Sequence, residues 1–183
     1  MPHKFDEAKQ AEFIEKYTAL KARLNADEPL LFMDAVHPTQ ATKITAGWIK
    51  TGIDKSIETS GSRTRLNVLG AIRLGVLSEA VISHCEKVNG DSIVEFLKKT
   101  RAQYCSSGKI HLVLDGAGYY RSSKVVEVAK KLSIELHYLP PYSPNLNPIE
   151  RLWKVMNKYA RNGKYFATTQ QFRQSLEGFF KLT

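Results

Sequence analysis

The chain has 183 residues and a mass of 20.7 kDa, and at roughly 100–200 residues per domain this length predicts one compact domain. Apolar residues make up 43% and charged residues 25%, which excludes a disordered or fibrous chain. Lys and Arg number 27 against 18 Asp and Glu, and the net charge of +9 favours a polyanionic partner such as nucleic acid or an anionic membrane surface over a merely soluble basic protein.

Several classes of protein are excluded by the pattern of apolar residues and cysteines. No window approaches the roughly 18 consecutive apolar residues of a transmembrane helix, and the first residues, MPHKFDEAKQAEF, lack the apolar stretch of a secretory signal. Cys85 and Cys105 are lone thiols without histidines at ligand spacing, so neither a disulfide framework nor a zinc site is indicated. We expect a cytosolic protein that does not enter a membrane.

The first half of the chain predicts a helix followed by strands. Apolar residues recur at three- and four-residue steps over 6–24, which predicts an amphipathic helix. The apolar run from Leu30 to Met33 ends on Asp34, as a buried strand does when it delivers a polar residue at its end. Residues 43–49 and 65–74 predict two further strands of an antiparallel meander, and 76–83 is compatible with another short strand.

The second half predicts an alternation of helices and strands. A helix is expected over 91–106, with Asp91 or Asn89 as its N-cap, and the apolar strand 110–114 again ends on an acid, Asp115. A glycine-bearing loop, a helix over 121–132 and a strand over 134–139 follow. The proline-rich residues 140–148 exclude regular structure, and Pro148 favours the start of a helix through 162, with a last helix over 169–180. This order predicts an α/β fold with a mixed sheet, antiparallel in one half and parallel in the other.

Three acids are candidate ligands of a divalent cation. Asp34 and Asp115 each end an apolar strand, and Glu150 lies in the first helical turn after a segment with four prolines. Two carboxylates side by side repel each other unless a cation neutralises them, and hard oxygen ligands suit Mg²⁺ or Mn²⁺. Each acid alone also fits an ordinary turn, cap or helix-start residue. Together, three carboxylates from separate elements would hold two ions for phosphoryl displacement on a polyanion.

Four segments make the chain resemble the DDE transposases of the mariner-like superfamily, and in particular the insertion-sequence 630 branch. LPPYSPNLNPIERLW at 139–153 resembles the signature around the third catalytic acid, and LLFMDAVH at 30–37 the first-Asp strand. RLNVLGAI at 65–72 resembles the third strand, and HLVLDGAGYYRS at 111–122 the second-Asp strand and loop. The resemblance implies a ribonuclease H-like fold, a five-stranded sheet with three antiparallel and then two parallel strands, flanked by helices. It also implies that Asp34, Asp115 and Glu150 form a catalytic and metal-binding triad.

The resemblance implies an enzyme that cleaves and joins DNA strands at transposon ends with Mg²⁺ or Mn²⁺, through two ions. Residues 1–28 are expected to lead into a catalytic domain at 29–183, and the helix-turn-helix modules of the family are not expected in this sequence. Double-stranded DNA, a homodimer on that DNA and a bacterial cytoplasm with association to the nucleoid follow from the same resemblance. The basic residues expected to hold the DNA backbone are Arg63, Arg65, Arg121, Lys124, Arg151 and Lys154.

Two alternatives remain open at the level of the sequence. A stand-alone ribonuclease H-like nuclease would share the fold and the acids but not strand transfer. A catalytically inert, DNA-binding remnant of a transposase is the other, because Tyr120 stands where the family usually carries a histidine and a tyrosine does not titrate near neutral pH. We expect Trp48 and Trp153 to pack in the core, and His37 to be a surface or capping residue.

Overall fold

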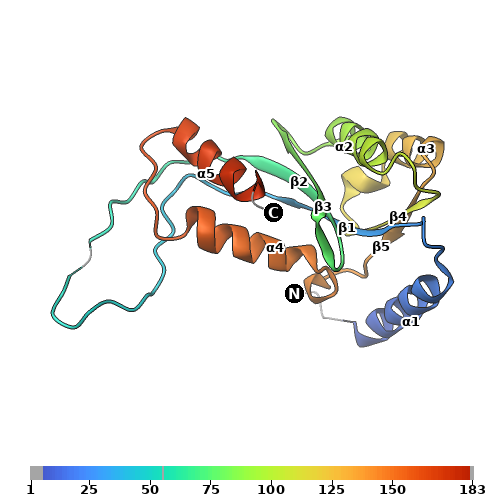
Figure 1. The fold of residues 1–183 in the computed structure, drawn as a ribbon, viewed down its shortest axis with the longest axis horizontal. Helices are drawn as coiled ribbons and strands as arrows, with labels where there is room; N and C mark the ends of the chain where they lie inside the picture. Colours follow the sequence, from blue (N-terminus) through green and yellow to red (C-terminus); the bar gives the residue numbers. More distant parts are fainter. Residues whose placement is uncertain (1–5, 55, 182–183) are drawn as a thin grey trace.

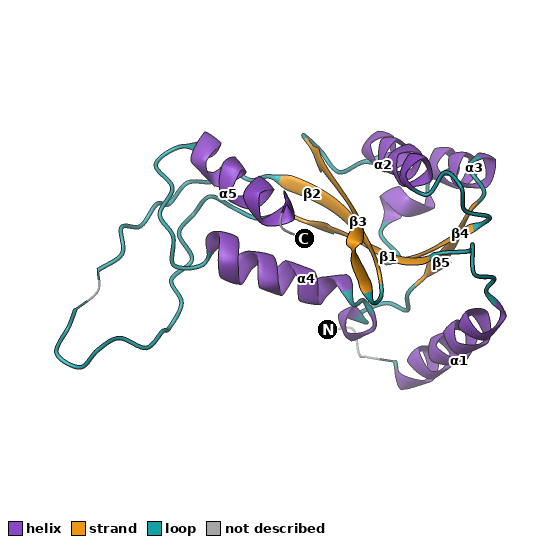
Figure 2. Ribbon diagram, viewed as in Figure 1, coloured by secondary structure: helices purple, strands orange, loops and turns teal. Residues whose placement is uncertain are grey.

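The computed structural model describes residues 6–54 and 56–181, which form a five-stranded mixed sheet between layers of helices (Figures 1 and 2). The strands lie in the order β3-β2-β1-β4-β5. In chain order the helices and strands are α1 (Glu7–Arg23), β1 (Leu30–Val36), β2 (Asn67–Arg73), β3 (Val76–Cys85), α2 (Gly90–Gln103), β4 (Ile110–Leu114), α3 (Ser123–Lys131), β5 (Ile134–Tyr138), α4 (Ile149–Met156) and α5 (Thr169–Lys181).

The two halves of the sheet meet at β1. This strand pairs antiparallel with β2, which pairs antiparallel with β3, and on its other side β1 pairs parallel with β4, which pairs parallel with β5. The predicted α/β fold class, with three antiparallel and two parallel strands, is therefore confirmed. Because β1 is central, its residues are covered by strands on both sides and by helices on both faces.

Alternating side chains of the strands build two separate cores. On one face Leu31 and Met33 pack with residues of α2 and α3 such as Phe96 and Val125. On the other face Phe32 packs with α4 and α5, and Phe13 and Tyr17 of α1 join the edge of that core. Figure 2 shows the resulting layers, with α2 and α3 over one side of the sheet and α4 and α5 over the other. This alternation is the period of two that strands impose on buried residues.

The predicted strand over 43–49 is wrong. These residues are irregular and belong to a long excursion between β1 and β2 that extends away from the sheet in Figure 1. Ile44 is 71% exposed and the indole of Trp48 is fully exposed, so the expectation that Trp48 packs in the core is also wrong. An alternating apolar pattern needs a neighbouring strand and a core to cover it, and the excursion offers neither.

The other boundaries differ from the predictions by a few residues. β1 continues two residues beyond Asp34, and 76–83 proves to be part of the ten-residue β3. Asn89 is the N-cap of α2, because its side chain accepts from the backbone N–H of Ser92 at 3.0 Å. The proline-rich stretch contains one short 3₁₀ turn, Pro144–Leu146. A single π-helical turn, Asn157–Arg161, follows α4 in place of the predicted continuous helix.

Candidate active site

Three acids from three elements line one cavity. Asp34 comes from β1, Asp115 follows directly after β4, and Glu150 lies in the first turn of α4. The cavity has a volume of about 330 Å³, and its other walls come from the loop after β4 and from the proline-rich segment 139–147. The structure therefore brings together the three carboxylates that the sequence singled out.

The indole of Trp153 holds one oxygen of the Asp34 carboxylate. The indole N–H of Trp153 on α4 donates to Asp34 Oδ2 at 3.0 Å, and the ring is buried. Gly70 makes this approach possible, since it pairs with Asp34 in the β1–β2 register. A Cβ at position 70 would lie 2.5 Å from Trp153 Cη2 and 3.1 Å from Ile149 Cδ1. The glycine thus leaves the space through which the indole crosses β2 to reach the carboxylate.

The charge of Asp34 is unfavourable in this setting. The pKa of the Asp34 carboxyl is raised to about 6, chiefly by burial and also by the negative charges of Glu150 and Asp115. Hydrogen bonds from the Ala35 backbone and from the Trp153 indole oppose the rise. A cation between the three carboxylates would therefore favour the ionised form of Asp34.

Asp115 is fixed by the turn that follows β4. Its Oδ1 accepts from the backbone N–H of Ala117 at 2.9 Å, a local bond typical of aspartate at a turn. The tyrosines of the same loop have different environments. Tyr119 is partly exposed, whereas Tyr120 is completely buried in the core beneath α2 and α3. Tyr120, which stands in the family's histidine position, is therefore a packing residue and does not line the cavity.

Glu150 is positioned by a proline-rich segment that is tied to two other elements. Buried Gln10 of α1 donates to Ser143 Oγ at 2.7 Å, and the side-chain amide of Asn147 donates to the carbonyl of Met33 at 3.2 Å. Ile149, which precedes Glu150, is fully buried. Because these contacts fix the segment before α4 and its first turn, they also fix the place at which the Glu150 carboxylate enters the cavity.

The donor set suits a hard divalent cation. Besides the three carboxylates, the cavity is lined by Asn147, whose carbonyl oxygen Oδ1 is buried and has no hydrogen-bond partner. An unpaired buried acceptor is costly, and carboxylate and amide oxygens are the ligands that Mg²⁺ and Mn²⁺ prefer. The atoms are not gathered around a single point: in the described part of the chain, the three acids are not among the groups whose ligand atoms all lie within 4.8 Å.

The six basic residues expected to bind DNA take different positions. Arg121 lines the cavity with the acids, and its guanidinium lies 4.2 Å from the centre of the Tyr138 ring. Arg151 and Lys154 are exposed on α4 just after Glu150, and Arg63 and Arg65 are exposed on the excursion before β2. Lys124 is paired with Asp91 at the start of α2.

Sequence reasoning missed two polar groups of the site. Trp153 was expected only to pack, and it does, but its N–H also orients Asp34. Asn147 had no assigned role, although an asparagine between two prolines and three residues before Glu150 indicates a polar group near that candidate acid. His37 is exposed, as expected, and its Nδ1 lies 2.8 Å from Asn67 Oδ1.

The family of the chain is shown by its sequence. Residues 29–173 match the sequence model of the family described as DDE superfamily endonuclease. The chain belongs to this family. A curated relative of this DDE endonuclease is the insertion element IS630 uncharacterized 39 kDa protein of Shigella sonnei, which is 26% identical over 147 residues. The match covers 78% of the present chain and 43% of the relative, so the chain spans less than half of that protein.

Solved structures show the same fold in transposases. The catalytic domain of Mos1 mariner transposase superposes with a TM-score of 0.63 and 14% identity, over 100% of this chain and 86% of that one. The Mos1 mariner paired end complex with Mn gives a TM-score of 0.71 and 15% identity, over 100% and 58% of the two chains. The likeness shows that the sheet and helices of the DDE endonuclease have the ribonuclease H-like arrangement of the Mos1 catalytic domain. Within the described residues no helix is long and apolar enough to cross a lipid bilayer.

Proposed function

We propose that this chain is the catalytic part of a transposase, in which Asp34, Asp115 and Glu150 promote cleavage of DNA strands and their transfer to a new site. The observation that carries the proposal is the cavity lined by all three acids, each delivered by a different element. The family match supports the reaction class. Residues 29–183 would form the catalytic domain, and the helix in 1–28 would lead into it.

The cavity residues fit Mg²⁺ or Mn²⁺, and the paired end complex of Mos1 with Mn supports that choice. Asp34, Asp115 and Glu150 would hold two ions, with the unpaired Oδ1 of Asn147 as an additional oxygen donor. When bound, such ions make the attacking water or 3′-hydroxyl more nucleophilic and stabilise the leaving oxygen. Trp153 holds Asp34 Oδ2 through its N–H, which would restrict rotation of the carboxylate when a ligand enters.

The basic residues would bind the DNA backbone around this cavity. Arg121 is the residue among the six that lines the cavity itself, and its planar guanidinium suits two phosphate oxygens at once. Arg151, Lys154, Arg63 and Arg65 would hold flanking phosphates, and Lys124 would first have to leave Asp91. Contacts to phosphate carry little sequence information. Two DNA ends would be paired by a homodimer, in the bacterial cytoplasm and close to the nucleoid.

The test compares DNA cleavage by the parent protein with cleavage by two Asp→Asn variants, one at a candidate ligand and one at an exposed control position. The parent should nick supercoiled plasmid in Mn²⁺ and stop doing so in EDTA, and Asp115→Asn should abolish nicking while the circular dichroism spectrum is unchanged. Asp27→Asn is the control, because Asp27 is an exposed aspartate of the turn before β1. Nicking by Asp115→Asn at the parental rate would refute the assignment of the triad.

The same experiment separates the two alternatives. A stand-alone nuclease would cleave but would not join a supplied 3′-hydroxyl end to a target plasmid, whereas a transposase would form the joined product. An inert remnant would do neither, and it would bind no Mn²⁺ that depends on Asp115. Joined product from the parent chain, absent with Asp115→Asn, is the outcome we expect.

A further inference from the structure

A second cluster of potential metal ligands lies on the parallel strands β4 and β5. His111 of β4 and Glu135 of β5 are partners in the parallel register, and His137 follows two residues later on the same face of β5. His111 lies four residues before Asp115, so at about 3.3 Å per residue the cluster is about 13 Å from that acid along the strand. His137 pairs with Val113 and is nearer to that end of the sheet, but none of the three residues lines the cavity of the acids.

The side chains of this cluster already converge. Nδ1 of His111 and Nε2 of His137 lie 3.0 Å apart, and their rings are stacked with centroids 5.2 Å apart. Glu135 Oε1 is 3.8 Å from His137 Nε2, and Glu135 Oε2 is 4.0 Å from His111 Nδ1. One ligand atom from each residue can thus be chosen so that all three lie within 4.8 Å of one another.

We propose that His111, Glu135 and His137 bind Zn²⁺, or a divalent transition metal of the same borderline class, at a site that joins β4 to β5. Two imidazoles and one carboxylate are a known ligand set for zinc, with a water or another ligand in the fourth position. Nitrogens 2.0–2.1 Å from a tetrahedral zinc lie about 3.3 Å apart, so the observed 3.0 Å requires an opening of only a few tenths of an ångström.

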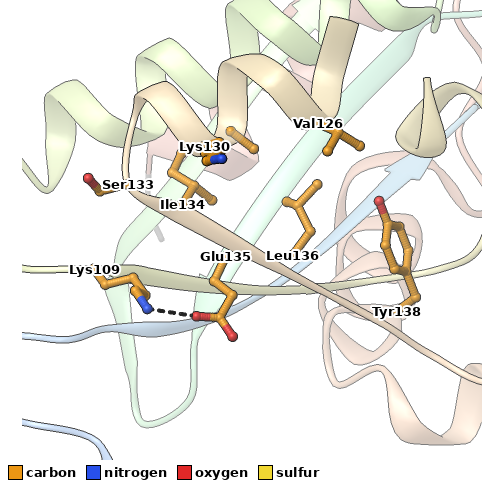
Figure 3. A pocket seen from close by; sticks show the side chains of 9 residues that line it. Lys109, Val126, Lys130, Ser133, Ile134, Glu135, Leu136 and Tyr138 are labelled. Carbon is orange, nitrogen blue, oxygen red and sulfur yellow. Dashed lines mark hydrogen bonds and ion pairs between the residues drawn. The ribbon is translucent and has the colours of Figure 1, made fainter. Parts of the chain in front are cut away.

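The neutral state of the two imidazoles and the hydrogen bond that holds Glu135 both favour metal binding. Burial lowers the pKa of both imidazoles, and metal ligation needs the neutral ring. Without a metal the two nitrogens share one proton, because two lone pairs or two N–H groups at that distance repel. Lys109 donates to Glu135 Oε2 at 2.9 Å (Figure 3), which leaves Oε1 for the metal and orients the carboxylate as outer-shell partners do.

An ion can reach the cluster from solvent. The side chain of Glu135 is 40% exposed and borders a groove of about 450 Å³ between β5 and α3 (Figure 3). His137 lines a different cavity, of about 380 Å³, between β5 and α1. His111 is buried, so the ion would lie at the surface of the sheet with one deep and two shallow ligands. Mg²⁺, which prefers oxygen, should not compete for two imidazoles.

The experiment measures zinc binding to the whole chain with Mg²⁺ in excess. We expect one zinc per chain by equilibrium dialysis, and visible d–d absorption of a low-symmetry site when Co²⁺ is used as the probe. His137→Gln and Glu135→Gln should each weaken zinc binding by at least about tenfold. Both residues are proposed as direct ligands, and even the loss of a residue that only orients a ligand costs about 10–100-fold. Both residues are partly exposed, so these variants should fold, which circular dichroism verifies. His84→Gln, at an exposed histidine of β3, is the matched control and should bind as the parent does.

A further variant distinguishes this site from the acids. Asp115→Asn should keep its zinc, and zinc should raise the Tm of the parent and of Asp115→Asn but not that of His137→Gln. If the parent binds no stoichiometric zinc, or if His137→Gln binds it equally well, the proposal is wrong and the histidines are only a hydrogen-bonded pair. Zinc that is lost in Asp115→Asn and kept in His137→Gln would also overturn it, because the ion would then lie at the acids.

Discussion

Replacing Asp34 by asparagine should make the metal-free protein more stable at neutral pH while it abolishes DNA cleavage. The substitution keeps the size of the side chain and its oxygen facing the Trp153 indole, and it removes the charge. That charge is unfavourable because the carboxyl is largely shielded from solvent and lies next to Asp115 and Glu150, with a pKa raised to about 6. The gain should appear only where Asp34 is ionised, so its dependence on pH is part of the prediction.

The sign and the magnitude follow from proton linkage. In the folded state Asp34 holds its proton up to about pH 6, and its ordinary pKa is 3.8. Below pH 3.8 Asp34 is protonated in both the folded and the unfolded chain, so its charge does not lower the stability of the folded state. As the pH rises to about 6 the unfolded chain loses its proton first, and stability falls. At about 1.4 kcal/mol for each tenfold change in proton affinity, the loss is about 3 kcal/mol above pH 6.

The assay is unfolding by urea and by heat in EDTA, at pH 4.5 and pH 8. The advantage of Asp34→Asn over the parent should grow from about 1 kcal/mol at pH 4.5 to about 3 kcal/mol at pH 8. For a domain of this size the larger value corresponds to a rise in Tm of about 6–12 °C. Asp27→Asn, at an exposed position, should stay within about 0.5 kcal/mol of the parent at both pH values.

Two results would refute this reasoning. If Asp34→Asn is no more stable than the parent at pH 8 in EDTA, the carboxylate is not an unfavourable buried charge. Mn²⁺ supplies the second test, because an ion between the acids should stabilise the parent and bring it back toward the variant. An equal gain in Tm for both proteins on adding Mn²⁺ would mean that Asp34 is not a ligand.

Two further substitutions test the surroundings of the triad. Gly70→Ala should lower the free energy of unfolding by about 1–3 kcal/mol by overpacking against Trp153, and it should slow cleavage by displacing the indole from Asp34. Gly178→Ala is the control, because a Cβ at that position meets open space. Parental stability and cleavage in Gly70→Ala would contradict the close approach of the indole to Gly70. Tyr120→Phe should cleave DNA at the parental rate because Tyr120 is fully buried, and a loss of about tenfold, 1.4 kcal/mol of barrier, would give its hydroxyl a role in the reaction.

The sequence predicted those elements whose burial is evident from a short run of apolar residues. The apolar runs 30–33 and 110–114 predicted buried strands because a strand covered on both faces needs no polar side chains, and both acids at their ends lie in the cavity. The segment 43–49, in which Lys43, Thr45 and Gly47 alternate with apolar residues, also predicted a strand but pairs with none. An alternating pattern is a weaker indication than a continuous apolar run, because it forms a strand only where the rest of the fold supplies a neighbouring strand and a core.

The parts that escaped prediction are contacts between distant positions. Trp153 and Asp34 are 119 positions apart, and their hydrogen bond depends on a glycine of a third element, at position 70. The histidines at 111 and 137 are only a weak signal in the sequence, because each is one polar residue in a short strand and His137 shares its strand with Glu135. Because the spacing of cysteines and histidines along the chain gave no metal motif, only the β4–β5 register reveals the cluster.

The position of Asp34 explains why stability and function oppose each other at this site. A carboxylate on the central strand, with helices over both faces of the sheet, loses more hydration than one at the edge of the fold. Asp115 follows the end of β4 and Glu150 lies in the first turn of α4, whereas Asp34 lies within the central strand β1. The charge that destabilises the empty protein is the one that a cation can best stabilise, because a buried carboxylate gains most from a neighbouring positive charge. The same burial that costs about 3 kcal/mol without metal therefore favours tight binding of the ion on which we propose the reaction depends.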